Sequence, residues 1–162
     1  MSRAEAIEIK SAAPELVEAA IVNLLDVAQN TIIMTTGLFP PFYNRPKVRS
    51  AVEKAANRVR SFNIILDNYV DVDRMRQELP WLFALASEPN RKITITRSES
   101  KIPHWMVIDG RHLRLEEPHS QAEGGRSNLI VKNADASEET KPSLAKVTSD
   151  LARFLAQSIP VS

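Results

Sequence analysis

The stretch from Ile102 to His119, IPHWMVIDGRHLRLEEPH, constrains the fold most, because it has the pattern of a complete β-hairpin. Its centre, Asp109-Gly110, is typical of a two-residue type I′ turn, in which both central residues need a positive φ. Apolar and polar residues alternate on either side, as they do in strands with one buried face. The stretch therefore predicts two neighbouring antiparallel strands.

A two-residue turn also predicts which residues of the two strands face each other. The expected pairs are Ile108 with Arg111, Met106 with Leu113, and His104 with Leu115. His104 would then lie at the open end of a core face, and Glu117 and His119 would project beside it if the return strand keeps its alternation. Trp105 and Arg114 would lie on the opposite face.

Two imidazoles and a carboxylate that meet at the end of an apolar surface form the candidate site of this sequence. We take His104 and His119 as candidate catalytic residues, because imidazoles are common general acids and bases. Asp109 becomes a third candidate only through the family resemblance of its strand. A structural interpretation stays open, since a histidine at the edge of a core is usually hydrogen-bonded to structural partners. Asp109 would then be a turn residue.

Composition limits the classes of protein to consider. A chain of 162 residues with 43% hydrophobic content is expected to form one globular domain. Its 21 basic and 20 acidic residues give no bulk attraction to nucleic acid or membrane. Without cysteine there is no disulfide, thiolate catalyst or cysteine-bound zinc. The charged start and the lack of a long apolar run predict a cytoplasmic protein without a transmembrane segment.

The remaining elements alternate between helices and strands. Helices are expected over 14–28, 47–60, 71–79, the stretch after Pro80, and from Pro142 through Leu155. Strands are expected over 4–10, 31–36, 62–66, around Ile93 and Ile95, and over 128–132. This order predicts an α/β domain in which a mixed β-sheet is flanked by helices. We place an N-terminal segment at 1–11 and the domain at 12–158.

The loop from Gly37 to Pro46 is rich in aromatic residues and prolines. It follows a predicted interior strand, and ligands of open α/β sheets bind near the carboxyl ends of strands. Phe42 and Tyr43 are therefore candidate ligand-binding residues, although the loop could also simply pack its rings over the sheet edge. The helix over 47–60 carries several arginines and lysines that could approach phosphate or form a solvated face.

Three segments resemble one half of the phospholipase D superfamily, over roughly residues 12–158. The strand 31–36 looks like the one that follows the first helix of these domains. The helix and strand from Val48 to Asp67 are similar to their second helix and strand. The segment Trp105–Asp109 looks like the strand that carries their H-x-K-x4-D motif. The resemblance implies a phospholipase D-like layered fold.

The resemblance also implies that the usual active site is lost. If Asp109 is the motif aspartate, His104 stands at the lysine position and Ile102 at the position of the nucleophilic histidine. Isoleucine cannot form a phosphohistidine. The Gly-Ser that the family places after the motif falls on Glu116-Glu117. The chain is thus similar to a degenerate branch, like the phospholipase D-like domain at the C-terminus of MIT proteins.

Three functions remain open. A non-catalytic binding or regulatory module would take a phosphate-containing ligand, nucleic acid or protein partner through His104, Arg111, Glu117 and His119. A divergent phosphodiesterase or nuclease would use His104 and His119, with Glu117 orienting an imidazole. A metal site of two histidines and Glu117 is the third hypothesis. We prefer the first, without metal or cofactor.

Assembly is a further expectation. Phospholipase D-like domains that come as a single half commonly pair across a shared cleft, so the resemblance implies a homodimer. The aromatic loop offers apolar area for such contact, and the near-zero net charge gives little long-range repulsion.

Overall fold

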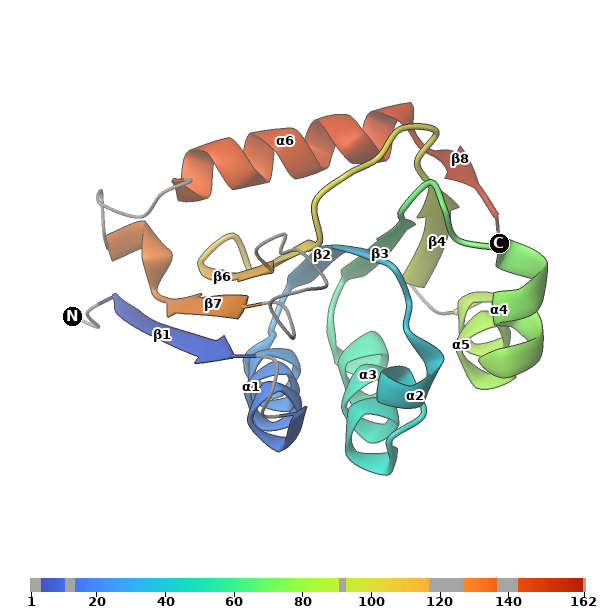
Figure 1. Cartoon of the computed structure of the whole chain (residues 1–162), viewed down its shortest axis with the longest axis horizontal. Coiled ribbons are helices and arrows are strands. Elements are labelled where there is room, and N and C mark those ends of the chain that lie inside the picture. Colours follow the sequence, from blue (N-terminus) through green and yellow to red (C-terminus); the bar gives the residue numbers. More distant parts are fainter. Residues whose placement is uncertain (1–3, 11–13, 91–92, 117–126, 137–142, 162) are drawn as a thin grey trace.

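An eight-stranded mixed sheet with helices on both faces organises the structure, a computed structural model (Figure 1). The structure describes residues 4–10, 14–90, 93–116, 127–136 and 143–161. The strands are β1 (Glu5–Lys10), β2 (Thr31–Thr36), β3 (Ser61–Leu66), β4 (Ile93–Arg97), β5 (Trp105–Ile108), β6 (His112–Glu116), β7 (Ser127–Lys132) and β8 (Ile159–Pro160). The helices are α1 (Pro14–Val27), α2 (Pro40–Tyr43), α3 (Pro46–Arg58), α4 (Val72–Glu78), α5 (Pro80–Ala86) and α6 (Leu144–Gln157), with a 3₁₀ turn η2 (Ala134–Ala136).

The sheet has the order β1-β7-β6-β5-β2-β3-β4-β8 among the described residues. Strands β2, β3 and β4 are parallel neighbours, and every other pairing is antiparallel. Parallel neighbours need crossover connections, which α3 provides between β2 and β3 and the α4–α5 pair provides between β3 and β4. The predicted α/β class with a mixed sheet is confirmed.

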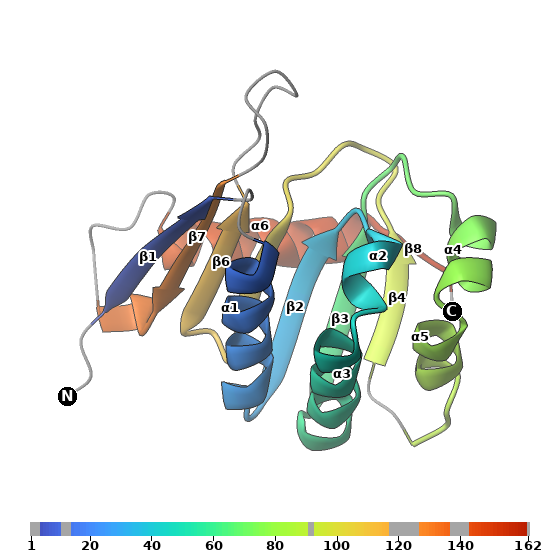
Figure 2. The same cartoon turned by 60° about the horizontal axis from the view of Figure 1, so that its bottom comes forward.

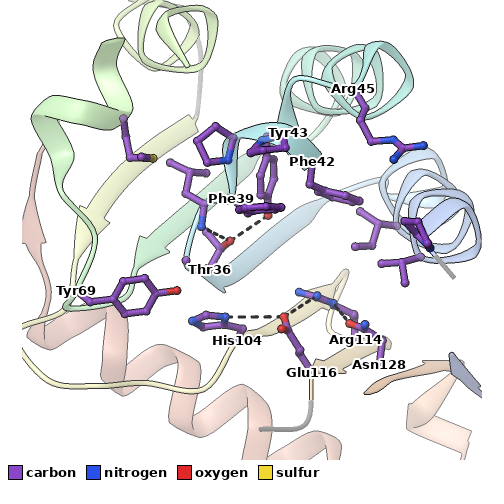
Figure 3. Close-up of a pocket in the computed structure, with 18 residues that line it drawn as sticks. Thr36, Phe39, Phe42, Tyr43, Arg45, Tyr69, His104, Arg114, Glu116 and Asn128 are labelled. Carbon is purple, nitrogen blue, oxygen red and sulfur yellow. Dashed lines mark hydrogen bonds and ion pairs between the residues drawn. The ribbon is translucent and has the colours of Figure 1, made fainter. Parts of the chain in front are cut away.

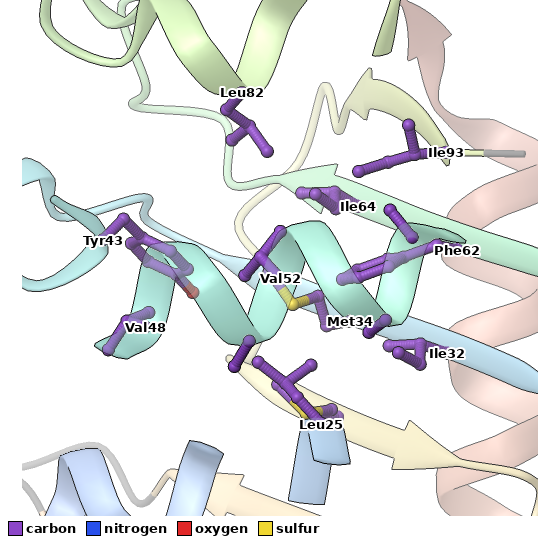
Figure 4. Close-up of a cluster of buried hydrophobic side chains, with 14 of the residues drawn as sticks. Leu25, Ile32, Met34, Tyr43, Val48, Val52, Phe62, Ile64, Leu82 and Ile93 are labelled. Atoms are coloured by element: carbon purple, nitrogen blue, oxygen red, sulfur yellow. The ribbon is translucent and has the colours of Figure 1, made fainter. Parts of the chain in front are cut away.

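Helices cover both faces of the sheet, and each face has its own core (Figure 2). The larger core lies under α1, α3 and α5, where Val52 of α3 packs over Phe62 and Ile64 of β3 (Figure 4). On the opposite face, α6 packs Val147 and Leu151 against Val107 and nearby residues of β5 and β6. The central strands are therefore buried on both sides, which explains their continuous apolar runs.

Most of the expected elements are present. The turn of the hairpin has φ of 55° at Asp109 and 63° at Gly110, as a type I′ turn requires. The strand expected over residues 4–10 is confirmed as β1, which pairs with β7 along its length. The short helix α2 inside the aromatic loop and the strand β8 were not expected, because both are too short to show a period.

The register of the hairpin is one residue away from the expected one. Ile108 pairs with His112 rather than Arg111, and Met106 pairs with Arg114 rather than Leu113. Arg111 N donates to Ile108 O at 2.9 Å, but the carbonyl of Arg111 accepts from Ala134 N at 2.7 Å. Arg111 therefore behaves as an extra residue in its strand, and pairing resumes at His112.

This shift exchanges the two faces of β6, because side chains alternate with a period of two. Leu113 and Leu115 belong to the core under α6, with Trp105 packed against it. Arg114 faces the larger core instead, and it is 8% exposed. The expectation that Leu113 and Leu115 share a face with His104 and Met106 was wrong.

The core under α6 gives a direct test of the second face. We expect Leu151→Ala, at a fully buried position, to lower the free energy of unfolding by about 2–5 kcal/mol, because it leaves a cavity between helix and sheet. Thr148→Ala, on the exposed side of the same helix, is the matched control and should change stability by less than about 0.5 kcal/mol. Urea unfolding followed by circular dichroism measures both. Equal stability of the two variants would contradict the packing of α6.

Candidate functional site

A pocket of about 740 Å³ opens beside the carboxyl end of β2, between α1, α2 and the hairpin strands (Figure 3). Its volume lies within the usual range for small-molecule sites. Apolar side chains and prolines form much of its wall, and polar groups gather at its base. The lining residues are Pro14, Val17, Ile21, Thr36, Gly37, Leu38, Phe39, Pro40, Pro41, Phe42, Tyr43, Arg45, Tyr69, Met75, His104, Arg114, Glu116 and Asn128.

His104 lies at the base and is held from two sides. Its Nε2 is 2.8 Å from Asp67 Oδ2, and its Nδ1 is 3.8 Å from Glu116 Oε2. Asp67 follows directly after β3 and is 1% exposed. The Asp67 carboxylate also accepts from the backbone N–H groups of Asn68 and Ile102. The imidazole is therefore fixed by a buried carboxylate that is itself anchored to the backbone.

Arg114 and Glu116 continue the polar base across the sheet. Arg114 Nη2 donates to Glu116 Oε2 at 2.8 Å, and Arg114 Nε donates to Asn128 Oδ1 at 2.8 Å. Glu116 pairs with Asn128 in the ladder between β6 and β7, and Glu116 N donates to His104 O at 3.1 Å. His104, Glu116 and Asn128 thus form one cross-strand row that faces the pocket.

Two hydroxyl groups complete the polar part. The oxygens of Thr36 and Tyr43 are 3.1 Å apart, and Thr36 Oγ1 accepts from Leu38 N at 2.9 Å. Burial raises the pKa of Tyr43, and the Arg114 charge and the Thr36 hydrogen bond only partly offset this. Tyr43 therefore remains a neutral phenol that can both donate and accept.

Aromatic rings surround the rest of the pocket. Phe42 and Tyr43 of α2 meet edge to face with ring centroids 5.3 Å apart. Phe39, just before α2, is 66% exposed, and Tyr69 on the loop after β3 is 61% exposed. The sequence-based candidates Phe42 and Tyr43 both line the pocket, and His104 lies with them.

Asp109 lies away from this pocket and has a structural role. Its carboxylate accepts from the backbone N–H groups of Gln29, Asn30 and Thr31 at 2.7–2.9 Å. Burial raises the pKa of Asp109, but these three donors together outweigh it and hold the pKa below its ordinary value. The turn residue thus joins the hairpin to the connection between α1 and β2.

The other predicted residues do not join His104 among the described residues. Arg111 lies at the turn end of the hairpin, away from His104, and donates to Asn133 and Asp135. Glu117 and His119 lie outside the described residues. Within the residues that the structure describes, no three histidine and acidic side chains are grouped to hold a metal ion.

Sequence reasoning missed Asp67, Tyr69, Arg114, Glu116 and Asn128 as site residues. Asp67 could have been found, because it ends a buried strand next to β2 in the parallel part of the sheet. Arg114 and Glu116 could not, because the expected register placed both on the opposite face. Asn128 could not, because its place beside Glu116 depends on the pairing of β6 with β7. Tyr69 lies in a loop without periodicity.

The comparisons with known proteins concern the fold. No family model matches the sequence, and no curated protein shows significant similarity to it. Among solved structures, the archaeal chromatin protein TrmBL2, described by its DNA binding, has a TM-score of 0.70 at 14% identity over 99% of this chain. NucT from Helicobacter pylori has a TM-score of 0.66 at 11% identity over 98% of this chain and 99% of its own length.

A third similar structure is phosphatidylserine synthase from Haemophilus influenzae Rd KW20, with a TM-score of 0.62 at 12% identity over 98% of this chain. The present chain spans 55% of the TrmBL2 chain and 39% of the synthase chain. At such low identity these likenesses concern architecture alone. The described residues contain no helix that is long and apolar enough to cross a membrane.

The structural role of Asp109 can be tested by substitution. We expect Asp109→Asn to lower the free energy of unfolding by about 1–2 kcal/mol at neutral pH, because an amide replaces a charged acceptor of three N–H groups. Asp135→Asn, which removes the exposed partner of Arg111, is the control and should cost less than about 0.5 kcal/mol. Chemical unfolding measures both, and equal losses would contradict the assignment.

The same pair gives a pH dependence. The folded pKa of Asp109 lies below its ordinary value of 3.8, so its contribution is present above that pH and is lost as the pH falls through the folded pKa. The stability difference between wild type and Asp109→Asn should therefore shrink below about pH 4. A difference that grows on acidification would contradict this.

Proposed function

Since the chain has a phospholipase D-like fold, we propose that it is a non-catalytic binding module whose ligand occupies the pocket beside His104. The observation that carries this proposal is the pocket itself, a cavity of small-molecule size with apolar walls and a polar base. A regulatory role, in which the bound ligand or a protein partner alters the state of a larger assembly, is consistent with such a module.

The residues at the motif positions support a non-catalytic function. Ile102, at the position of the family's nucleophilic histidine, is 5% exposed and offers no nucleophile. His104, at the lysine position, is held between Asp67 and Glu116. A negatively charged Glu116 at the base would also repel the phosphate of a phosphodiester substrate.

One observation favours residual catalysis as an alternative. The buried contact of His104 with Asp67 is the arrangement that orients a histidine as general base. A divergent phosphodiesterase or nuclease would use this imidazole, with His119 as the further candidate from the sequence. The activity assay below distinguishes the two functions.

Nucleic acid is a weaker candidate ligand. The basic helix α3 uses much of its charge internally, since Arg49 pairs with Glu53 and Arg58 donates to the carbonyls of Leu25 and Ala28. Arg58 thereby satisfies the last carbonyls of α1, a structural role. The DNA binding described for TrmBL2 keeps nucleic acid among the partners to be tested.

The activity assay is direct. We expect no hydrolysis of bis-p-nitrophenyl phosphate or single-stranded DNA in the presence of EDTA, because Ile102, at the position of the nucleophilic histidine, cannot form a phosphohistidine. His104→Ala is the diagnostic variant, and His112→Ala, which removes an acceptor of the Asn133 N–H away from the pocket, is the control. Turnover by wild type that His104→Ala alone abolishes would reject the non-catalytic function and favour the phosphodiesterase.

A homodimer is the second part of the proposal. Phe39 at the pocket rim and Leu16 on α1 are large apolar side chains at 66% and 60% exposure, and a partner subunit would cover such area. Sedimentation equilibrium at micromolar concentrations should give the mass of two chains. Phe39→Asp should weaken the dimer, and it is a cleaner variant than Phe42→Asp because Phe42 packs partly against the core. A single-chain mass for wild type would contradict the dimer.

A further inference from the structure

The pocket is divided into an aromatic part and a charged part (Figure 3). Phe39 and Phe42 approach it from the α2 side, and Tyr69 approaches it from the opposite side, next to His104. Arg114 and Glu116 lie at the base. A ligand that fills this space therefore needs an apolar body and a polar group at one end.

The charges at the base are already balanced by the protein. Arg114 is paired with Glu116, and Arg45 at the rim is paired with Glu18 of α1. Asp67 adds a further carboxylate behind His104. Among the described residues that line the pocket or pair with its lining, carboxylates outnumber guanidinium groups.

This balance of charges disfavours binding of a ligand whose polar end group, its head, is a phosphate. A phosphate would have to compete with Glu116 for Arg114, whose side chain is 10% exposed, and would lie beside the Glu116 carboxylate in a poorly hydrated place. Separating a buried ion pair is costly because each charge then needs a new partner. The charges therefore disfavour the ligand class that the phospholipase D-like fold suggests.

The same groups suit a head that donates hydrogen bonds. A carboxylate accepts about four hydrogen bonds, so a donor can share Glu116 with Arg114. The phenol of Tyr43, which lines the pocket and is hydrogen-bonded to Thr36, offers a further acceptor and donor. Around the body of the ligand, rings of Phe39, Phe42 and Tyr69 supply apolar area, and they would also favour a cation.

We propose that the pocket takes a small molecule with an apolar, ring-sized body and a hydrogen-bond-donating head, an alcohol or a protonated amine, and rejects the corresponding phosphate. This rests on the proposed binding function and adds the class of ligand. The head lies against Glu116 and Tyr43, and the body lies between the α2 rings and Tyr69.

Gly37 makes the aromatic wall possible. A Cβ at this position would lie 1.9 Å from the Tyr69 hydroxyl oxygen and 3.2 Å from His104 Cε1. Gly37→Ala therefore has to displace the Tyr69 side chain and crowds His104. It serves as a control that alters the body of the pocket without altering its charge.

A matched set of ligands tests the proposal. We would titrate 2-phenylethanol, 2-phenylethylamine and 2-phenylethyl phosphate to about 10 mM, because ligands of this size bind weakly. Chemical shifts of the labelled protein report binding and its location. The alcohol, the amine or both should bind at least about tenfold more tightly than the phosphate. A tenfold preference for the amine over the alcohol would identify a cationic head.

Variants assign the effect to the head. Glu116→Gln removes the charge but keeps the shape, so affinity for the amine should fall by about tenfold and affinity for the phosphate should rise. Gly37→Ala should weaken all bound ligands by a similar factor. Tyr43→Phe keeps the ring, removes the hydroxyl and replaces Glu116→Gln if that variant does not fold. It should lower the affinities for the alcohol and the amine several-fold more than Gly37→Ala does.

The outcomes separate this inference from the proposed function. Tightest binding by the phosphate, or affinities that neither Glu116→Gln nor Tyr43→Phe changes, would overturn the ligand class and leave a binding pocket. Shifts with none of the three ligands would overturn both. Binding of the alcohol or amine that Glu116→Gln weakens selectively supports the proposal.

Discussion

The rest of the structure depends on the attachment of the hairpin turn to the connection between α1 and β2. Asp109 accepts three backbone N–H groups from residues 78–80 positions earlier in the chain, and its own N–H donates to Thr31 O. These bonds set β5 antiparallel to β2 with Ile108 opposite Ile32 and Met106 opposite Met34. Because residues are regularly spaced along a strand, fixing β5 at its Asp109 end also determines where His104 lies at its other end. A residue whose type suggested catalysis thus positions the pocket from a distance.

A second contact determines what accompanies His104. The carbonyl of Arg111 accepts a hydrogen bond from Ala134 N instead of pairing within the hairpin. Arg111 is therefore an extra residue in its strand, and the hairpin register shifts by one. Arg114 and Glu116 consequently turn toward the larger core, where an apolar pair would pack more simply. Buried ion pairs are weak sources of stability, so their presence here needs another reason. Places where a chain departs from simple packing rules tend to be functional, and this pair lies at the polar base of the pocket.

The sequence was sufficient to predict the fold and the position of His104. It was not sufficient to predict which side chains surround His104. Helices, strands and the type I′ turn follow from local periodicity and from Asp109-Gly110, which are properties of neighbouring residues. The register of β6 follows from a hydrogen bond to Ala134, more than twenty residues later, which no local pattern contains. One residue of slip was enough to exchange Leu113 for Arg114 on the pocket side. Asp67 was visible in the sequence as the end of a strand, but its contact with His104 depends on which strands are neighbours.

The two halves of the pocket have different effects on binding. Apolar walls contribute affinity roughly in proportion to the area they cover, at about 25 cal/mol per Å². The polar base contributes little net affinity, since any ligand exchanges hydrogen bonds with water for hydrogen bonds with the protein. Its groups are already fixed, however, from Asp67 through His104 and Glu116 to Arg114, so a mismatched head leaves a buried charge badly paired. Discrimination therefore comes from the penalty for the wrong head rather than from attraction to the right one. The proposed preference for a hydrogen-bond-donating head thus rests on charges that the protein has already paired with one another.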